Sequence, residues 1–236
     1  MKKKNKPVFV SAVIAAGGTS SRMNGDNKLL LEIGGIPVIA HSLLAFQSCD
    51  SISEIIISAH ESHLQTYADI AQYYDITKLT KVVKGGDTRL QSVYNAVKEC
   101  SKKADYILVH DAARPLITDE DIKTVIGDTI SHNCAAASNK VTDTVKKVSD
   151  RLAQSTVDRT DLYTVQTPQG ADRDLLYGAL EKAVGMSDGS VTDECSALEK
   201  IGIKPYMSDC SVCNIKITYP QDVFIANAIY DRRNKK

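Results

Sequence analysis

The chain contains no tryptophan, few phenylalanines and no excess of charge of either sign. Lysine plus arginine and aspartate plus glutamate number 29 each, so the protein lacks the overall basic field that attracts nucleic acid or an anionic membrane. No apolar run approaches the roughly 18 residues that a membrane-spanning helix needs. We therefore expect neither a nucleic-acid partner nor a membrane partner, and any cations that matter must act locally.

Cysteine pairs with the spacing of a metal site are also scarce. The six cysteines are scattered along the chain, and a chain of 236 residues does not need disulfides to hold its core, so we expect reduced thiols. Cys210 and Cys213 form one C-x-x-C, but no second pair and no nearby histidine completes a zinc site. A metal or redox role for this pair is therefore disfavoured.

The first residues have some features of a secretory signal peptide, because MKKKNK precedes the apolar run VFVSAVIAA. Pro7 interrupts the junction, and the apolar run continues directly into a glycine-rich loop with a chemical purpose of its own. We therefore reject the signal-peptide interpretation and expect a cytoplasmic protein.

Hydrophobic content of 43% over 236 residues is enough to bury one substantial core, so we predict a single domain over residues 1–236. Apolar, β-rich runs alternate with segments of helical spacing. The predicted strands are Val8–Ala15, Glu54–Ala59, Thr80–Val83, Asp105–Val109 and Cys134–Asn139, and the predicted helices are Ile36–Ser48, Glu61–Tyr73, Thr88–Cys100 and Thr118–Ser131. This alternation indicates an α/β fold, Rossmann-like, with a mostly parallel sheet, helices on both faces, and ligands at the carboxyl ends of strands.

The segment Val8–Lys28 carries the clearest chemical signal. Gly17 and Gly18 let backbone N–H groups approach a ligand closely, while Arg22 and Lys28 add two cations, a combination that suits a nucleoside triphosphate. The segment matches neither the P-loop nor the dinucleotide-binding G-x-G-x-x-G pattern. A plain strand-to-helix turn remains the alternative for this segment taken alone.

Two later motifs also follow predicted strands. In KGGDTRLQSV, Gly85 and Gly86 allow a second close backbone approach, although an ordinary glycine turn is at least as good an explanation. In HDAARP, Asp111 lies at a strand end beside Arg114, a placement that suits a Mg²⁺ ligand because Mg²⁺ often takes one protein carboxylate and several phosphate oxygens. The alternative is an Asp111–Arg114 ion pair that only orders the loop.

Together with these motifs, the later part of the chain resembles one enzyme family. The matching stretches are AAGGTSSRM with Lys28, GGDTRLQSV, HDAARP, VTDT at Val141–Thr144, VDR at Val157–Arg159, QTPQ at Gln166–Gln169, TDECSALE at Thr192–Glu199 and NIKIT at Asn214–Thr218. The chain resembles the 2-C-methyl-D-erythritol 4-phosphate cytidylyltransferases of the non-mevalonate isoprenoid pathway. The resemblance implies transfer of CMP from CTP to this sugar-alcohol phosphate, with release of pyrophosphate.

The resemblance also implies roles for particular residues. Arg22 and Lys28 would stabilise the transition state, and Arg159 and Lys216 would position the acceptor phosphate. Asp111 would hold Mg²⁺. Nucleotide contacts would come from Ala15, Ala16, Gly17, Gly18, Gly86, Asp87 and Ser92, and lesser substrate contacts from Arg114, Thr144, Thr167 and Thr192.

Residues 140–165 occupy the family's position for a β-arm that protrudes and joins a second subunit. Two β-prone stretches flank a polar turn at Ser149–Arg151, and such a hairpin cannot bury a core alone. A homodimer is therefore expected, in which Arg159 and Thr144 serve the neighbouring subunit's site.

Cys213 departs from the family pattern, because many members have an aspartate there that helps to bind the metal. Ribitol-5-phosphate cytidylyltransferases, which lack that aspartate, are the alternative family. Sugar-1-phosphate and molybdopterin nucleotidyltransferases match less well because HDAARP argues against them. A nucleotide-binding regulatory module without turnover is the non-enzymatic alternative, and it would have no need to keep charged groups in a cleft.

His110 is interpreted as a side chain that orders its loop, since an ionised phosphate nucleophile needs no general base.

Overall fold

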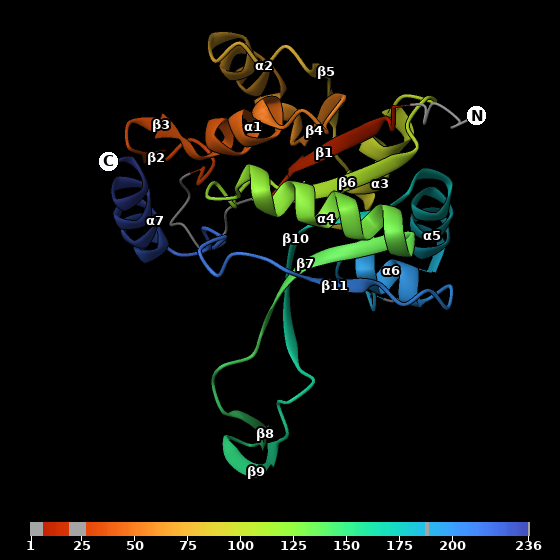
Figure 1. The fold of residues 1–236 in the computed structure, drawn as a ribbon, viewed down its shortest axis with the longest axis vertical. Coiled ribbons are helices and arrows are strands. Elements are labelled where there is room, and N and C mark those ends of the chain that lie inside the picture. Colours follow the sequence, from red (N-terminus) through yellow and green to blue (C-terminus); the bar gives the residue numbers. More distant parts are fainter. Residues whose placement is uncertain (1–6, 19–26, 187–188, 236) are drawn as a thin grey trace, which may run out of the picture.

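The computed structural model describes residues 7–18, 27–186 and 189–235. Its centre is a seven-stranded sheet (Figure 1). In spatial order the strands are β11 (Tyr206–Asp209), β7 (Cys134–Lys140), β10 (Tyr163–Asp172), β6 (Tyr106–Asp111), β1 (Val10–Ala16), β4 (Glu54–Ala59) and β5 (Leu79–Lys84). β10 runs antiparallel to β6 and β7, and the other adjacent pairs are parallel, which confirms the mostly parallel sheet.

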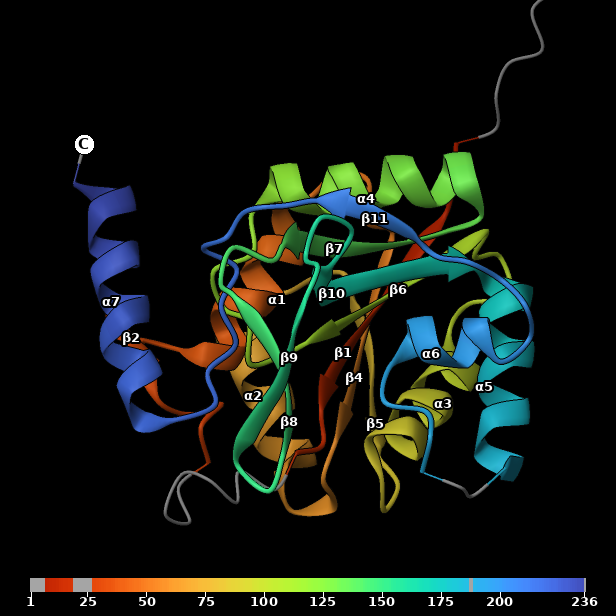
Figure 2. The ribbon, with the colours of Figure 1, turned by 90° about the horizontal axis from the view of Figure 1, so that it is seen from below.

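Helices cover both faces of the sheet, as Figure 2 shows from below. They are α1 (Val38–Ser48), α2 (Leu64–Tyr73) and α4 (Asp119–His132) on one face, and α3 (Arg89–Glu99) and α5 (Arg173–Met186) on the other. Side chains of β1 alternate between the two resulting cores: Ile14 packs in the core that contains Leu43 of α1, and Val13 in the core that contains Val93 of α3. A strand buried on both faces is apolar throughout, which explains the continuous hydrophobic run in the sequence.

The remaining described elements are short or peripheral. They are β2 (Glu32–Ile33), β3 (Ile36–Pro37), the 3₁₀ helix η1 (Glu61–His63), α6 (Glu194–Glu199) and α7 (Pro220–Asn234). α7 reaches back to the N-terminal half, where Asn227 accepts a hydrogen bond from the backbone N–H of Gly34 at 2.9 Å. Among the described residues, no helix is both long enough and apolar enough to cross a membrane.

Several predicted boundaries need correction. The helix predicted over 36–48 begins at Val38, because Ile36 and Pro37 pair with β2 instead. The helix predicted over 61–73 begins with a 3₁₀ turn. The start of α4 agrees with the prediction, because Thr118 and Asp121 form a reciprocal capping box there. No regular element was predicted after the arm, where β10 ends and where α5, α6, β11 and α7 are found.

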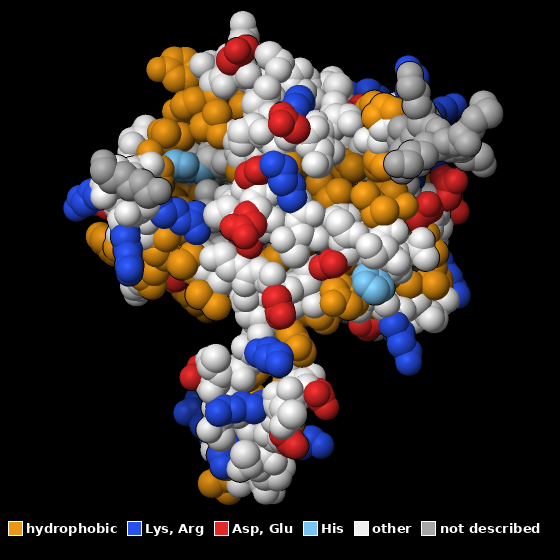
Figure 3. Space-filling view, in the orientation of Figure 1, with side chains coloured by type: hydrophobic (Ala, Val, Ile, Leu, Met, Phe, Trp, Pro, Cys, Tyr) orange, Lys and Arg blue, Asp and Glu red, His pale blue; other side chains and the backbone are white. Residues whose placement is uncertain are grey.

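A hairpin of β8 (Val145–Ser149) and β9 (Leu152–Val157) forms a separate two-stranded sheet that protrudes from the body (Figures 1 and 3). The two turn residues, Asp150 and Arg151, have φ angles of 51° and 64°, and a turn with both φ values positive matches the natural twist of paired strands. Nearly all of the hairpin's residues are exposed. The protruding β-arm predicted from the sequence is therefore present.

Candidate active site

The first cavity lies at the carboxyl ends of β1 and β6, beside the start of α3, and has a volume of about 270 Å³. Its lining includes all seven residues predicted to contact the nucleotide: Ala15, Ala16, Gly17, Gly18, Gly86, Asp87 and Ser92. Lys28, Asp111 and Lys216 also line it. Arg22, predicted to stabilise the transition state, lies outside the described residues.

Ser92 holds the two glycine loops in place around this cavity. Its hydroxyl accepts a hydrogen bond from the Gly86 N–H at 3.0 Å and donates to the Thr88 carbonyl at 2.8 Å. A Cβ atom at Gly17 would lie 3.2 Å from this hydroxyl oxygen, and one at Gly85 would lie 2.7 Å from it. The absence of a side chain at both glycines therefore lets the loops close onto α3, which is a packing reason for them in addition to ligand approach.

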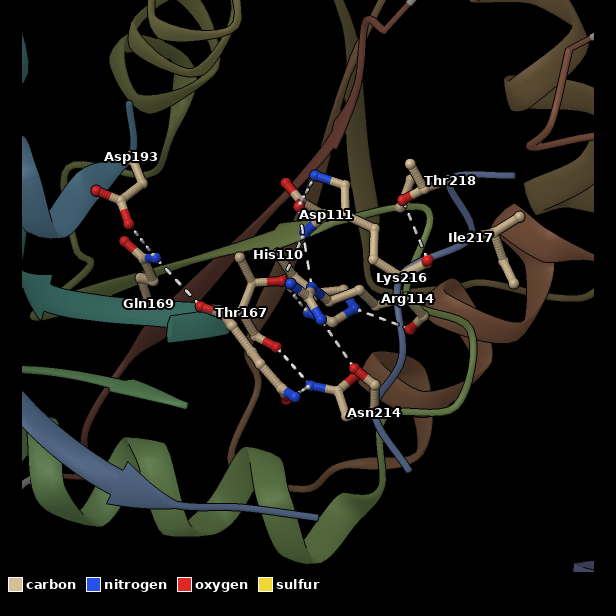
Figure 4. Close-up of polar contacts among 12 residues, drawn as sticks. His110, Asp111, Arg114, Thr167, Gln169, Asp193, Asn214, Lys216, Ile217 and Thr218 are labelled. Atoms are coloured by element: carbon tan, nitrogen blue, oxygen red, sulfur yellow. Dashed lines mark hydrogen bonds and ion pairs between the residues drawn. The ribbon is translucent and has the colours of Figure 1, made fainter. Parts of the chain in front are cut away.

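Asp111 is the last residue of β6 and is the centre of the charged groups (Figure 4). Its Oδ2 accepts from Lys216 Nζ at 2.6 Å, and its Oδ1 accepts from Arg89 Nη2 at 3.1 Å. Arg114 Nε lies farther away, at 3.9 Å from Oδ2. Burial by itself would raise the pKa of Asp111, but these three cations outweigh burial and hold the pKa below its usual value. Arg114 therefore interacts with Asp111 more weakly than Lys216 and Arg89 do. This argues against the alternative in which an Asp111–Arg114 ion pair only orders the loop.

A buried chain of hydrogen bonds fixes the backbone of Asp111. The Asp111 N–H donates to Thr167 Oγ1 at 3.0 Å, so the Thr167 hydroxyl hydrogen is free to donate to His110 Nδ1 at 3.1 Å. His110 Nε2–H then donates to the Arg114 carbonyl at 3.2 Å. Burial lowers the pKa of His110 to about 4, so the ring is neutral at pH 7. His110 orders the loop, as predicted, because both of its nitrogens are engaged.

The segment Asn214–Thr218 brings Lys216 to Asp111, although the two are 105 positions apart in the sequence. Asn214 is fully buried and its Nδ2 donates to the Thr167 carbonyl at 2.8 Å. The N–H of Ile217 donates to the Ala113 carbonyl at 2.8 Å, and the carbonyl of Ile217 accepts from Lys28 Nζ at 2.9 Å. This segment therefore connects the first loop to the loop that follows β6.

A second cavity of about 240 Å³ adjoins the first. Three of the residues predicted to contact the substrate line it: Arg114, Thr167 and Thr192. Arg89, Asp111 and Lys216 line both cavities, so these side chains separate the two spaces and are reachable from each.

The structure does not bring Thr144 and Arg159 to either cavity. Both are exposed near the base of the β-arm, where the Arg159 guanidinium donates to the backbone carbonyl of Thr142. Within one subunit, Thr144 and Arg159 therefore lie apart from the other residues that were predicted to contact the acceptor.

From the sequence, the loop that carries Arg89 was a candidate for contacts with a base or ribose, and Glu194 was given no role. The Arg89 guanidinium forms two bonds to the Glu194 carboxylate, at 2.8 Å and 3.1 Å, and also contacts Asp111. Glu194 raises the pKa of Arg89 above its usual value. Both residues lie within motifs quoted above, GGDTRLQSV and TDECSALE, but their spacing of 105 positions gave no signal that they meet.

Glycine-rich strand ends surround a cavity that is lined by two lysines and two aspartates and lies next to a second polar cavity. This arrangement suits the site of a nucleotidyltransferase. The model of one such family, IspD or 2-C-methyl-D-erythritol 4-phosphate cytidylyltransferase, matches residues 10–232. The chain belongs to this family.

Relatives with this name align over nearly the whole chain. The protein from Halalkalibacterium halodurans is 34% identical over 227 residues, which are 96% of this chain and 99% of the relative. The protein from Clostridium botulinum (strain ATCC 19397 / Type A) is 35% identical over 224 residues, covering 94% of this chain and 97% of the relative. A solved structure described as the 4-diphosphocytidyl-2C-methyl-D-erythritol synthase of Anaerococcus prevotii is similar with a TM-score of 0.85 and 29% identity, over 96% of this chain and 97% of that one.

Proposed function

We propose that the protein transfers CMP from CTP to 2-C-methyl-D-erythritol 4-phosphate and releases pyrophosphate. The observation that carries this proposal is the meeting of the two cavities at Asp111 and Lys216. The cavity beside the glycine loops suits the triphosphate, and the adjoining cavity suits the acceptor. Because the reaction consumes CTP, we also propose that the protein acts in the cytoplasm.

In this reaction an oxygen of the acceptor phosphate attacks the α-phosphorus of CTP, and the bond to the pyrophosphate oxygen breaks. Two anions must approach each other, so the protein's contribution is charge neutralisation and alignment. Lys216 is placed to neutralise the acceptor phosphate because it lines both cavities, and Lys28 to neutralise the triphosphate because it lines the first. Arg22 is proposed to act with Lys28. His110 takes no proton, since it is fully buried and both of its nitrogens are engaged.

We propose Asp111 as the protein ligand of Mg²⁺. Among the described residues, no group of three or more histidine, cysteine, aspartate or glutamate side chains could hold a metal, so most ligands must come from phosphate oxygens and water. Asp111, which lines the proposed triphosphate cavity, fits that requirement because Mg²⁺ often takes only one or two protein carboxylates. Bound there, Mg²⁺ would neutralise charge on the triphosphate. Cys213, where the resemblance described above implies an aspartate, supplies no carboxylate.

We propose that the β-arm joins two subunits and that Arg159 and Thr144 contribute to the partner's site. Two apolar side chains of the arm are exposed, Val148 with 56% and Leu152 with 69% of its surface accessible. A two-stranded hairpin is barely stable alone, so these side chains suit a contact with a partner. Leu152→Asp is expected to convert the dimer to a monomer in sedimentation experiments. Gln154→Asp, which adds the same charge at a polar position of β9, should leave the dimer intact. A monomeric wild-type protein would contradict the proposal.

Pyrophosphate release with CTP and Mg²⁺ tests the activity, with 2-C-methyl-D-erythritol 4-phosphate and ribitol 5-phosphate compared as acceptors. We expect a clear preference for the first. Cys213 is the observation that favours the second acceptor, and a preference for ribitol 5-phosphate would establish that alternative activity. No pyrophosphate with either acceptor would favour the non-enzymatic regulatory module.

A further inference from the structure

We propose that Glu194 is a positioning residue of the reaction: it holds the Arg89 guanidinium between the two cavities, so that Asp111 keeps one orientation and holds Lys216 in one position beside both cavities. This inference rests on the proposed function, because it concerns the same site. It assigns a role to two charged residues that no step of the proposed reaction uses directly.

The geometry of Arg89 is that of a clamp. Arg89 Nη1 and Nη2 donate to the two oxygens of Glu194 at 2.8 Å and 3.1 Å, while Nη2 and Nε donate to Asp111 Oδ1 at 3.1 Å and 3.3 Å. The planar guanidinium presents its donors in a fixed fork, so two bonds to Glu194 determine the plane in which Arg89 meets Asp111. Asp111 Oδ2 is thereby left to Lys216.

Glu194 is itself anchored to the body of the protein. It lies in the first turn of α6, whose N-terminus is closed by a capping box between Asp193 and Ser196. The side chain of Gln169 on β10 donates to Asp193 at 2.9 Å and accepts from the Cys195 N–H at 2.8 Å. The Glu194 side chain is only 2% exposed. Glu194 is therefore a rigid support for Arg89, and it is not among the residues that line the two cavities.

The balance of charge around Asp111 also requires the carboxylate of Glu194. Three cations, Arg89, Arg114 and Lys216, lie within 4 Å of Asp111, which alone could neutralise only one of them. With Glu194, this group of five charged side chains carries one net positive charge. Without the Glu194 carboxylate, Arg89 would be free to pair fully with Asp111 and to compete with Lys216 for it. The expected defect is therefore in alignment during turnover, not in nucleotide binding.

Glu194→Gln is the first test, because it keeps the size of the side chain, removes the charge and replaces one of the two acceptor oxygens with an NH2 donor. Glu199→Gln at the exposed end of the same helix is the matched control. We expect Glu194→Gln to lower kcat by about 30-fold while the Kd for CTP, measured by calorimetry, changes by less than about threefold, the pattern of an interaction needed in the transition state. The control should match the wild type in both measurements. A kcat within about twofold of wild type would overturn the inference.

A second test separates positioning from simple support of α6. Arg89→Lys keeps the charge and loses the fork, so we expect it to lower kcat by a similar factor. If Glu194 acts through Arg89, adding Glu194→Gln to Arg89→Lys should cause little further loss, because the coupled effect is already gone. A second loss of about 30-fold in the double variant would show that Glu194 acts by another route and would overturn the inference.

A third measurement does not depend on turnover, so it distinguishes failure of this inference from failure of the proposed function. Bonds to both Nη atoms should slow rotation of the Arg89 guanidinium and give separate Nη resonances in ¹⁵N NMR, assigned by comparison with Arg89→Lys. We expect these resonances in the wild type and in Glu199→Gln, and averaged ones in Glu194→Gln. Averaged resonances in the wild type would overturn the clamp, whereas resolved ones in a protein that releases no pyrophosphate would contradict only the proposed function.

Discussion

His110 makes the stability of the protein depend on pH in a defined window. Burial holds the pKa of His110 at about 4, against about 6.5 for an exposed histidine. Between these two values the unfolded chain binds a proton that the folded protein does not bind, so the free energy of unfolding falls as the pH falls. One pKa unit is worth about 1.4 kcal/mol, so the full difference amounts to ~3 kcal/mol lost between pH 6.5 and pH 4.

Urea unfolding at a series of pH values from 7.5 to 4 (about one-half unit apart) measures this loss directly. His110→Asn is the informative variant, because its amide oxygen replaces the Nδ1 acceptor without a group that titrates in this window. The variant should be less stable than the wild type at pH 7.5 but should lose ~3 kcal/mol less on acidification. His60→Asn, at an exposed position, is the control for replacing a histidine by an asparagine.

Other titrating groups do not account for the difference in pH dependence between the wild type and His110→Asn. Burial also lowers the pKa of His41, but His41 is present in every variant and its contribution cancels. The depressed pKa of Asp111 contributes stability that begins to be lost at about pH 5, as the unfolded chain starts to bind this proton, but Asp111 is present in every variant as well. Equal pH slopes for wild type and His110→Asn would refute the assignment of a buried, neutral His110.

Three further predictions concern single side chains. Lys28→Ala should lower kcat by about 100-fold while circular dichroism shows an intact fold, since Lys28 is proposed to neutralise the triphosphate; unaltered turnover would remove Lys28 from the mechanism. Asp193→Ala removes the cap of α6 and should destabilise the protein by ~1 kcal/mol in chemical unfolding, and no loss would show that the cap is dispensable. Cys213→Asp should lower the Mg²⁺ concentration for half-maximal turnover, and an unchanged Mg²⁺ dependence would mean that position 213 does not face the metal.

The α/β class could be predicted because its causes are local. β1 is apolar on both faces since helices cover both sides of the sheet, and Thr118 with Asp121 marks the beginning of α4 through bonds between near neighbours. The beginning of α1 was misplaced because Ile36 looks like a helical residue until it pairs with Ile33 of β2. Strand pairing between separate segments competes with helix periodicity, and only the folded chain decides between them.

The site, like the fold, has parts that could be predicted from the sequence and parts that could not. The glycine loops and the motif around Asp111 could be found in the sequence because each carries its chemistry within a few residues of one strand end. The contacts of Lys216 with Asp111 and of Arg89 with Glu194 could not be foreseen, because each joins segments that are 105 positions apart.

The sequence by itself thus determined the types of chemical groups and the strand ends that carry them. The tertiary structure alone decided which charges meet. The antiparallel insertion of β10 beside β6 brings Thr167 and Gln169 to the strand end of Asp111, and Gln169 holds the N-terminus of α6 that carries Glu194. Electrostatic energy depends on distances between atoms, and those distances exist only after the sheet and its helices have assembled.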